Sequence, residues 1–333
     1  MRVAVIGCGK QAPKHLQGLR GAGLSNRDLV VADVDHQRAS GLASKEGITS
    51  VALDRLWDDQ RIKAVVIATP TPTHAELCGR AVDASKAFLC EKPLANNGAE
   101  ARQLAERADR AGVVGMVGYI YRSVPVFQQV HRLIRDDSVM GQLNLALLRI
   151  GGRGSHQAWK HRRNHGGGAI NEMLVHILDL ALWLFGPPRQ ARLLASELRA
   201  PVRLINGREE QVDAEDVVLV RLDYGAGPSI YLQADMLTPA FTQRLEVQGT
   251  NGTLVASIQR EEPSYLYLAD KGGVRPAGRH ALQHDDGDPY TIQSRTFLDA
   301  VAARQMPAYG SLGDAVLLHQ LIDQLHTQQE KYT

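Results

Sequence analysis

The chain of 333 residues is long enough for two domains, and its hydrophobic fraction of 44% is enough to build a core in each. Its formal net charge is +2, with no basic tail or acidic block. Charge alone therefore gives no reason to expect nucleic acid or an anionic membrane as a partner, and neither is predicted.

The first 120 residues alternate short apolar strands with amphipathic helices. Fully apolar strands between helices are typical of a parallel sheet covered on both faces, so a doubly wound α/β domain is expected over residues 1–120. The predicted strands are 3–6, 28–32, 64–68, 87–90 and 113–117, and the predicted helices are 13–22, 36–46, 73–85 and 97–111.

Beyond Gly141 the strands lengthen, and apolar residues alternate with polar ones. We expect strands at 142–150, 217–224, 229–234, 244–247 and 253–256. The apolar stretch 168–185 predicts a helix packed on their sheet. Residues 121–333 are therefore predicted to form an α+β domain with one large, open-faced, mostly antiparallel sheet. The last helices, 291–304 and 312–330, are expected to pack back over the assembly.

A glycine turn, GCGKQA (7–12), follows the first strand and opens a helix. Its spacing is GxGxxA. Gly7 permits a tight turn, Gly9 lets the backbone approach a pyrophosphate, and Ala12 allows close packing of the helix. The phosphates would lie at the helix N-terminus, so Lys10 and Gln11 are also expected cofactor contacts.

Asp33 ends the second strand, about 20 residues beyond the glycine turn. A carboxylate there accepts a hydrogen bond from the adenosine ribose and repels a 2′-phosphate, which favours NAD over NADP. The alternative is a tight turn that binds no phosphate, with Asp33 as a solvated strand-end residue.

The segment ATPTPTH (68–74) ends the next central strand, at the edge where parallel sheets bind ligands. Thr69, Pro70, Thr71 and His74 are expected cofactor contacts. An ordinary connection to a helix, with Thr73 as N-cap, explains His74 equally well.

Three cysteines, Cys8, Cys78 and Cys90, form an odd number without CxxC spacing. This pattern is typical of free thiols in a reducing compartment. The apolar start of the chain is too short for a signal peptide, and no stretch is expected to span a membrane. A soluble, cytoplasmic protein is predicted.

Several motifs together resemble the Gfo/Idh/MocA oxidoreductases, named for glucose–fructose oxidoreductase, inositol dehydrogenase and a rhizopine-catabolism protein. They are GxGxxA with His15 in the following helix, Asp33, ATPTPTH, EKP at 91–93 and GGGAINEMLVHILD at 166–179. The resemblance by motif covers residues 1–188, and the remainder agrees in pattern only.

The resemblance implies a Rossmann domain followed by an open-faced sheet domain, with the nicotinamide of NAD between them. It implies a sugar, cyclitol or sugar derivative as substrate. It also implies homodimers or homotetramers that form through the open sheet.

Lys92 is the first candidate catalytic residue. Oxidation of an alcohol requires a group that takes the hydroxyl proton and one that stabilises the developing alkoxide. The Lys92 ammonium can donate to the oxygen, and a partly desolvated lysine can also act as a base. The resemblance favours a cis bond between Lys92 and Pro93, and Glu91 is expected to accept from the nicotinamide ribose. The competing explanation is a strand-end ion pair.

Glu172, His176 and Asp179 occupy positions i, i+4 and i+7 of the predicted helix 168–185, on one stripe of an otherwise apolar surface. So apolar a helix should be buried, and the stripe should face a wet or reactive cavity. The family has Asp at the position of Glu172 and His at that of His176, which implies a proton-accepting or hydrogen-bonding role for His176. Glu172, one methylene longer, either orients His176 or reaches the substrate. One alternative is a Glu–His pair with a purely structural role. A metal site is not predicted, because the sequence shows no second pair of His or Cys residues with ligand spacing.

Tyr119, Tyr121 and Arg122 follow the last Rossmann strand. They are expected to contact nicotinamide or substrate. The alternative is that they pack the joint between the domains.

The loop 151–168 is rich in hydrogen-bond donors, His156 among them, and Trp159 and Arg163 are expected to contact substrate. Its excess of cations suits a phosphorylated or nucleotide-linked sugar, although a solvated loop explains it as well. Tyr290 is expected at the far rim of the substrate site.

The predicted function is an NAD-dependent oxidoreductase that moves hydride between nicotinamide and a secondary hydroxyl or its ketone. His176 is the favoured base and Lys92 its electrostatic partner, with the reverse assignment left open. One alternative is an enzyme that retains NAD and uses transient oxidation for glycosidic cleavage or epimerisation. The other is a regulator that senses dinucleotide without catalysis.

Overall fold

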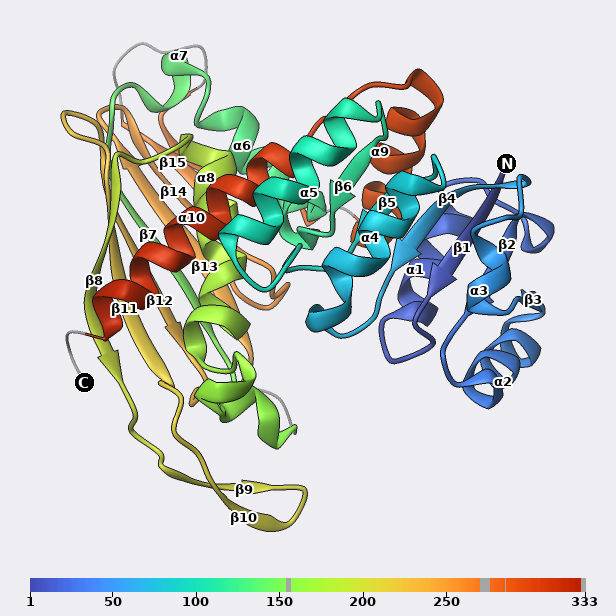
Figure 1. Cartoon of the computed structure of the whole chain (residues 1–333). Coiled ribbons are helices and arrows are strands. Elements are labelled where there is room, and N and C mark those ends of the chain that lie inside the picture. The colour runs from blue at the N-terminus through green and yellow to red at the C-terminus, as the bar shows by residue number, and fades with distance from the viewer. Residues whose placement is uncertain (154–156, 270–275, 285, 331–333) are drawn as a thin grey trace. The chain divides into compact units, whose positions relative to one another are not determined.

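The computed structural model describes residues 1–153, 157–269, 276–284 and 286–330. They form two compact units (Figure 1). The first unit contains Met1–Ser123 and Gly287–His319, and the second contains Val124–Asp286 and Gln320–Thr333. The sequence predicts a boundary at 120/121 and last helices that pack back over the assembly, and residues 287–319 group with the first unit.

The first unit contains a six-stranded parallel sheet in the order β3-β2-β1-β4-β5-β6. This is the order of a doubly wound dinucleotide-binding sheet, which confirms the predicted fold. Its strands are β1 (Arg2–Ile6), β2 (Leu29–Ala32), β3 (Thr49–Ser50), β4 (Ile62–Ile67), β5 (Ala87–Cys90) and β6 (Gly115–Val117). Only β3 was not predicted, because two residues are too few to show a pattern.

The helices of the first unit agree with the predicted ones to within two residues at each end. They are α1 (Ala12–Gly21), α2 (His36–Glu46), α3 (Leu53–Leu56), α4 (His74–Asp83), α5 (Gly98–Arg110), α9 (Pro289–Ala303) and the short turns η1 (Asn26–Asp28), η2 (Thr71–Thr73) and η3 (Ile120–Ser123). The short helix α3 and the turns η1, η2 and η3 were not predicted from the sequence. Asp35 and Asn97 cap α2 and α5 with their side chains, as N-cap residues of these types do.

Two glycines on α1 explain why a segment so late in the chain joins the first unit. A Cβ atom on Gly18 would lie 2.5 Å from the carbonyl oxygen of Tyr290, and one on Gly21 would collide with Thr291. Glycine at both positions lets the start of α9 lie directly on α1. The contact between α1 and α9 joins residues far apart in the sequence, so a local sequence pattern cannot predict it.

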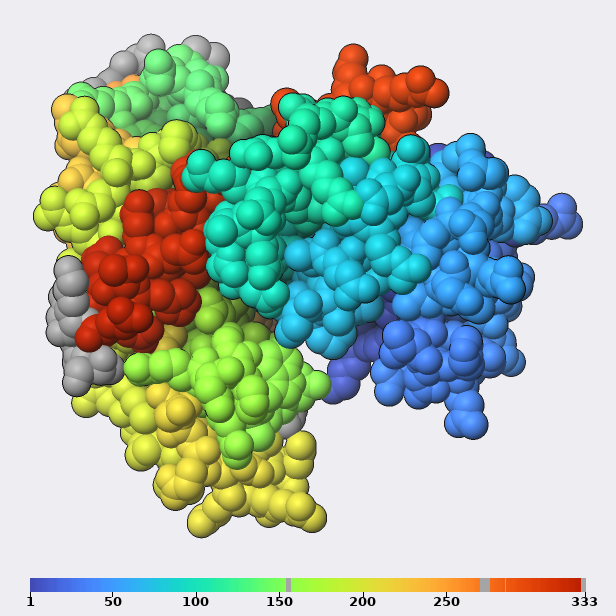
Figure 2. Space-filling view, viewed as in Figure 1, coloured from blue at the N-terminus to red at the C-terminus, as the bar shows by residue number. Residues whose placement is uncertain are grey.

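The second unit contains an eight-stranded sheet in the order β16-β15-β14-β13-β7-β12-β11-β8. All neighbours are antiparallel except β7 and β12. Its strands are β7 (Leu143–Gly151), β8 (Gln190–Glu197), β11 (Val217–Asp223), β12 (Ser229–Asp235), β13 (Thr242–Gly249), β14 (Gly252–Ser257), β15 (Tyr265–Leu268) and β16 (Gly278–Ala281). A separate hairpin, β9 (Val202–Ile205) and β10 (Arg208–Gln211), projects at its lower end (Figures 1 and 2).

Helices cover one face of this sheet (Figure 1). They are α6 (Pro125–Leu133), α7 (Asp137–Met140), η6 (Ile170–Leu174), α8 (Val175–Phe185) and the end of α10 (Leu312–Gln329), with short turns at η4 (Ala158–His161) and η5 (Arg163–His165). Along β11 the residues Val218, Val220 and Leu222 are fully buried, whereas their neighbours are half-exposed. This alternation confirms the mostly antiparallel, open-faced sheet.

Among the described residues, one helical stretch, Arg163–Phe185, is long and apolar enough to cross a membrane by composition alone. The sequence-based expectation was that no stretch would qualify. However, 72% of the apolar window is buried within the protein. The stretch therefore has the burial of a core helix in a globular protein.

A glutamine in the core of the second unit predicts an unusual stability effect. Gln243 on β13 has no exposed surface, and within the described chain neither its amide nitrogen nor its amide oxygen has a hydrogen-bond partner. A buried, unsatisfied amide costs about 1–3 kcal/mol. Gln243→Leu should therefore raise the free energy of unfolding by about 1–3 kcal/mol, measured by urea denaturation.

Gln248→Leu on the same strand is the matched control. Its half-exposed amide donates to Glu246 Oε1 at 2.7 Å, so its replacement should give no gain. Destabilisation by Gln243→Leu would show that the amide has a favourable partner.

Candidate active site

Three predicted motifs lie at one edge of the first unit's sheet. The glycine turn follows β1, ATPTPTH follows β4, and EKP follows β5. These strands are neighbours in a parallel sheet, so their carboxyl ends lie side by side. In doubly wound sheets this edge, where the strand order reverses, is the ligand-binding crevice.

The glycine turn has the geometry of a dinucleotide site. Gly7 has φ +92°, and a Cβ atom there would lie 2.7 Å from the Ala68 carbonyl oxygen, so only glycine is accommodated. A Cβ atom on Gly9 would meet nothing within 4 Å, which leaves open space where a pyrophosphate can approach. Gly9, Lys10 and Gln11 are exposed and Ala12 is buried, an arrangement that suits the predicted roles.

Asp33 contributes to the glycine turn as well as to the expected ribose site. It is 6% exposed, and its Oδ2 accepts the Cys8 N–H at 2.7 Å. Oδ1 accepts the Asp35 N–H at 2.9 Å. Burial, followed by the Asp33 charge, raises the pKa of the Cys8 thiol to about 11, so this thiol stays protonated at neutral pH.

His74 joins two strand ends. Its ring is 1% exposed, with Nδ1 2.6 Å from the Pro93 carbonyl oxygen and Nε2 2.8 Å from the Thr69 carbonyl oxygen. Both ring nitrogens are therefore within hydrogen-bond distance of backbone carbonyl oxygens, and neither is available to a cofactor. The structure assigns His74 the role of connecting two strand ends, in place of the predicted cofactor contact. Thr69, Pro70 and Thr71 remain exposed or half-exposed at the edge.

Glu91 is held by a histidine that the sequence placed on the first helix. His15 Nε2 lies 2.8 Å from Glu91 Oε1, and the Lys92 N–H donates to Oε2 at 3.3 Å. Burial alone would raise the pKa of Glu91, but the His15 hydrogen bond and the nearby His15, Lys92 and His74 charges outweigh it and lower that pKa. Glu91 is therefore ionised and fixed in place.

Tyr290 lies in the first unit, beside this cluster. Its ring packs edge-on against His15 with centroids 5.2 Å apart, and its hydroxyl donates to Gln11 Oε1 at 3.1 Å. Burial, then the charges of Glu91 and Asp288, raises its pKa. Tyr290 therefore lies beside the glycine turn, and its contact with substrate stays a prediction.

Lys92 is half-buried at the end of β5, and the bond between Lys92 and Pro93 is cis, as the resemblance implied. Arg122 is only 2% exposed, and its Nη1 lies 3.0 Å from Asp314 Oδ2 in the same unit. Tyr119 is 3% exposed, with the Arg122 guanidinium over its ring. Both residues thus pack within the first unit, and their contact with nicotinamide or substrate stays a prediction. Tyr121 is half-buried, and burial raises its pKa.

In the second unit the predicted helix 168–185 begins with a π-helical segment. η6 covers Ile170–Leu174, and α8 continues to Phe185. Single π turns within helices occur often at functional sites. Glu172 and His176 are half-exposed, whereas Asp179 is 1% exposed, so the predicted polar stripe is open only at its first two members.

The loop before this helix brings a lysine to Glu172. Lys160 Nζ lies 2.5 Å from Glu172 Oε2, and the same ammonium lies 5.2 Å from the centre of the Trp159 ring. Trp159 is 40% exposed. Arg163 is exposed, and its backbone N–H donates to Asp213. His156, in the predicted donor-rich loop, lies outside the described residues.

The described part of the chain contains no cluster of three His, Cys, Asp or Glu side chains that could hold a metal ion. Its three cysteines are buried free thiols.

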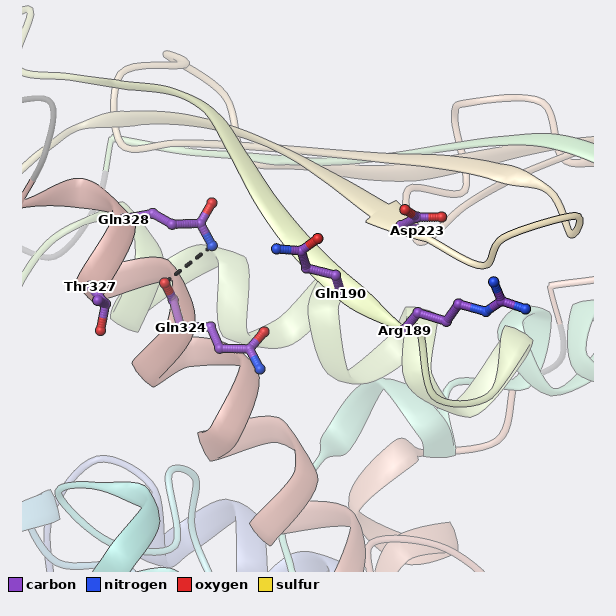
Figure 3. A pocket seen from close by; sticks show the side chains of 6 residues that line it. All are labelled: Arg189, Gln190, Asp223, Gln324, Thr327 and Gln328. Atoms are coloured by element: carbon purple, nitrogen blue, oxygen red, sulfur yellow. Dashed lines mark hydrogen bonds between the residues drawn. The ribbon is translucent and has the colours of Figure 1, made fainter.

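The second unit contains a hollow of about 520 Å³ with polar residues in its walls (Figure 3). Two of its residues, Arg189 and Gln190, follow the end of α8, whereas His176 is at the start of α8 and Glu172 is on the preceding η6. Its walls are formed by Arg189, Gln190, Asp223, Gln324, Thr327 and Gln328. No predicted site residue contributes to it.

Comparison with known proteins gives two family matches. A model described as "Oxidoreductase family, NAD-binding Rossmann fold" matches residues 1–119, and a "GFO/IDH/MocA C-terminal domain" matches residues 127–255. An uncharacterised oxidoreductase of Synechocystis sp. is 30% identical over 271 residues, which cover 77% of this chain and 71% of that protein. Inositol 2-dehydrogenase of Rhizobium meliloti is 25% identical over 301 residues, covering 90% and 88%.

Solved structures give the same fold. Levoglucosan dehydrogenase in complex with NADH and L-sorbose has a TM-score of 0.88 and 21% identity, covering 100% of this chain and 97% of that one. At this identity the likeness shows the fold alone.

Proposed function

The chain belongs to the GFO/IDH/MocA oxidoreductase family, and from that premise we propose that it is an NAD-dependent dehydrogenase of a sugar, cyclitol or sugar derivative. It oxidises a secondary hydroxyl or reduces the matching ketone. The observation that carries the proposal is the carboxyl edge of the first unit's sheet, where a dinucleotide turn follows β1 and a half-buried lysine follows β5, with β4 between the two strands.

The residues of the first unit fit NAD. The open space at Gly9 would admit the pyrophosphate, and we assign the carboxylate of Asp33, which follows β2, to the adenosine ribose. Glu91, ionised and anchored by His15, accepts from the second ribose. When bound, the nicotinamide accepts or donates the hydride.

Two side chains are assigned to proton transfer and charge stabilisation. We assign acceptance of the hydroxyl proton during oxidation to His176, and stabilisation of the developing alkoxide charge to the Lys92 ammonium. His176 suits this role because it is half-exposed on a helix whose other side chains are mostly buried.

Substrate recognition falls to Lys160, Glu172 and Trp159. The ammonium and the carboxylate are adjacent and half-buried, so they offer a donor and an acceptor to neighbouring hydroxyls of a polyol. The exposed Trp159 ring offers an apolar surface to the C–H face of a sugar.

Lys160→Met should raise KM about tenfold or more and change kcat less, because it removes a charged hydrogen bond that forms on binding. Steady-state kinetics measure the split, and an unchanged NAD dissociation constant is the control. An unchanged KM would remove Lys160 from the substrate site.

The test of the proposed function is a substrate panel. Inositols, free sugars, sugar phosphates, nucleotide sugars and aminoglycoside-type sugars are incubated with NAD or NADP, and NADH or NADPH absorbance is followed. At least one polyol should reduce NAD, and NADP should react more slowly because Asp33 repels its phosphate. A changed substrate without free NADH would instead identify an enzyme that retains NAD.

The open sheet is our proposed site of self-association. Leu147 on β7 and Leu194 on β8 are each 43% exposed, and such apolar exposure suits burial against a second copy. Sedimentation velocity should show a dimer or tetramer, and a monomer at micromolar concentration would contradict it. The buried free thiols support our placement of the protein in the reducing cytoplasm.

A further inference from the structure

A buried carboxylate holds the start of the helix that carries Glu172 and His176. The Ile170 N–H donates to Glu215 Oε1 at 3.0 Å, and the Ala169 N–H donates to the Glu215 carbonyl oxygen at 2.9 Å. Glu215 is 3% exposed. It therefore satisfies two N–H groups at the helix start, and its negative charge lies at the favourable end of the helix dipole.

The glycine run before the helix makes this contact possible. Gly168 has φ +111°, and a Cβ atom on it would lie 2.7 Å from the Glu215 carboxyl carbon. Any side chain at this position would displace the carboxylate. The last glycine of GGGA therefore admits Glu215 to the helix start.

The end of α10 is attached to the same place. Gln329 is 5% exposed, and its Nε2 donates to Glu215 Oε2 at 2.8 Å and to Ser196 Oγ at 2.8 Å. One turn earlier, His326 Nε2 lies 3.0 Å from Oδ1 of Asn171, the neighbour of Glu172. Two side chains of α10 thus hold the helix start, one through Glu215 and one directly.

We propose that Glu215 and Gln329 are positioning residues, which set the direction of the helix so that Glu172 and His176 meet the substrate. The proposal rests on the proposed function. His176 is six residues beyond Ile170, about 9 Å along the helix, so a small tilt at the start displaces its ring. A displacement of about 1 Å can lower a rate about 100-fold.

Two adjacent glutamines provide the test. Gln328 precedes Gln329 on α10, but its amide bonds to the β8 backbone, accepting from the Leu193 N–H at 2.9 Å and donating to the Ala191 carbonyl oxygen at 2.9 Å. Gln328→Ala therefore removes a similar set of hydrogen bonds without touching the site helix. It is the matched control for Gln329→Ala.

Gln329→Ala should lower kcat about tenfold or more, leave the NAD dissociation constant within about twofold, and speed hydrogen exchange of peptides covering 169–176. Gln328→Ala should behave like wild type in all three. Glu215→Gln, which keeps an acceptor for the Ile170 N–H, should lose less kcat than Glu215→Ala. Equal losses of kcat in the two glutamine variants, or faster exchange with an unchanged kcat, would overturn the proposal.

If the proposed function is wrong, the wild-type protein forms no NADH from any member of the substrate panel. In that case kcat cannot be compared, and hydrogen exchange of peptides covering 169–176 is the remaining test of the positioning proposal. Equal exchange of 169–176 in Gln329→Ala and wild type overturns it.

Discussion

Replacing Lys92 with alanine should lower kcat about 10²–10⁴-fold while the NAD dissociation constant stays within about twofold. The lysine follows β5 at the carboxyl edge of the sheet, beside an ionised and anchored Glu91. In the proposed function the Lys92 ammonium acts on the substrate oxygen, whereas other residues bind the dinucleotide. The substitution should therefore change kcat and leave NAD binding nearly unchanged. Initial rates with the active panel substrate and fluorescence titration with NADH measure the two quantities.

Lys92→Arg separates the two roles that a lysine can play. Arginine keeps the positive charge but cannot lose a proton, so it supports electrostatic stabilisation and not base catalysis. With His176 as the base, Lys92→Arg should retain more activity than Lys92→Ala. An equal loss of activity in Lys92→Arg and Lys92→Ala would indicate that Lys92 is the base that accepts the hydroxyl proton. Lys63→Ala, at the exposed start of the neighbouring strand β4, is the control and should match wild type.

Replacing His176 with asparagine should lower kcat for oxidation about 10²–10⁴-fold and change the pH dependence of what remains. A base accepts a proton only when it is neutral, so oxidation by wild type should slow towards acidic pH. In His176→Asn this loss at acidic pH should disappear. The measurement is kcat against pH in both directions, and the reduction direction should show the opposite trend.

His165→Asn is the control, because that histidine is exposed in the loop that precedes the helix. It should leave the pH profile unchanged. A wild-type profile preserved in His176→Asn would remove His176 from proton transfer.

Local patterns were sufficient to predict most of the first unit. Each strand except β3 contains a run of apolar residues, and each predicted helix begins or ends near a proline, a glycine or a capping side chain. The glycine turn, Asp33 and Lys92 were found because their chemistry depends on neighbours along the chain.

Long-range contacts account for what the sequence did not predict. Glu215 lies 45 residues from Ile170, whose N–H donates to its carboxylate. The residues next to Glu215 in the sequence contain no pattern that predicts a helix cap. Tyr290 lies 279 residues from Gln11, so its place beside the glycine turn follows from the packing of α9 on α1. The π segment Ile170–Leu174 was missed because an apolar periodicity does not distinguish it from an α-helix.

His74 shows the same limit on a smaller scale. Its position after a strand and before a helix suited both a cofactor contact and a structural role. Only the distances of its two nitrogens from the Thr69 and Pro93 carbonyl oxygens separate them. Arg122 is similar, since its partner Asp314 lies 192 residues away.

Direct transfer of hydride from a carbinol carbon to NAD is the central claim, and deuterium labelling tests it most directly. The active member of the panel is prepared with deuterium at the carbon that carries the oxidised hydroxyl, and the NADH formed is examined by mass spectrometry and proton NMR. The account predicts NADH that carries the label at nicotinamide C4 and a ketone product without it. Unlabelled NADH, or release of the label to water, would contradict the account.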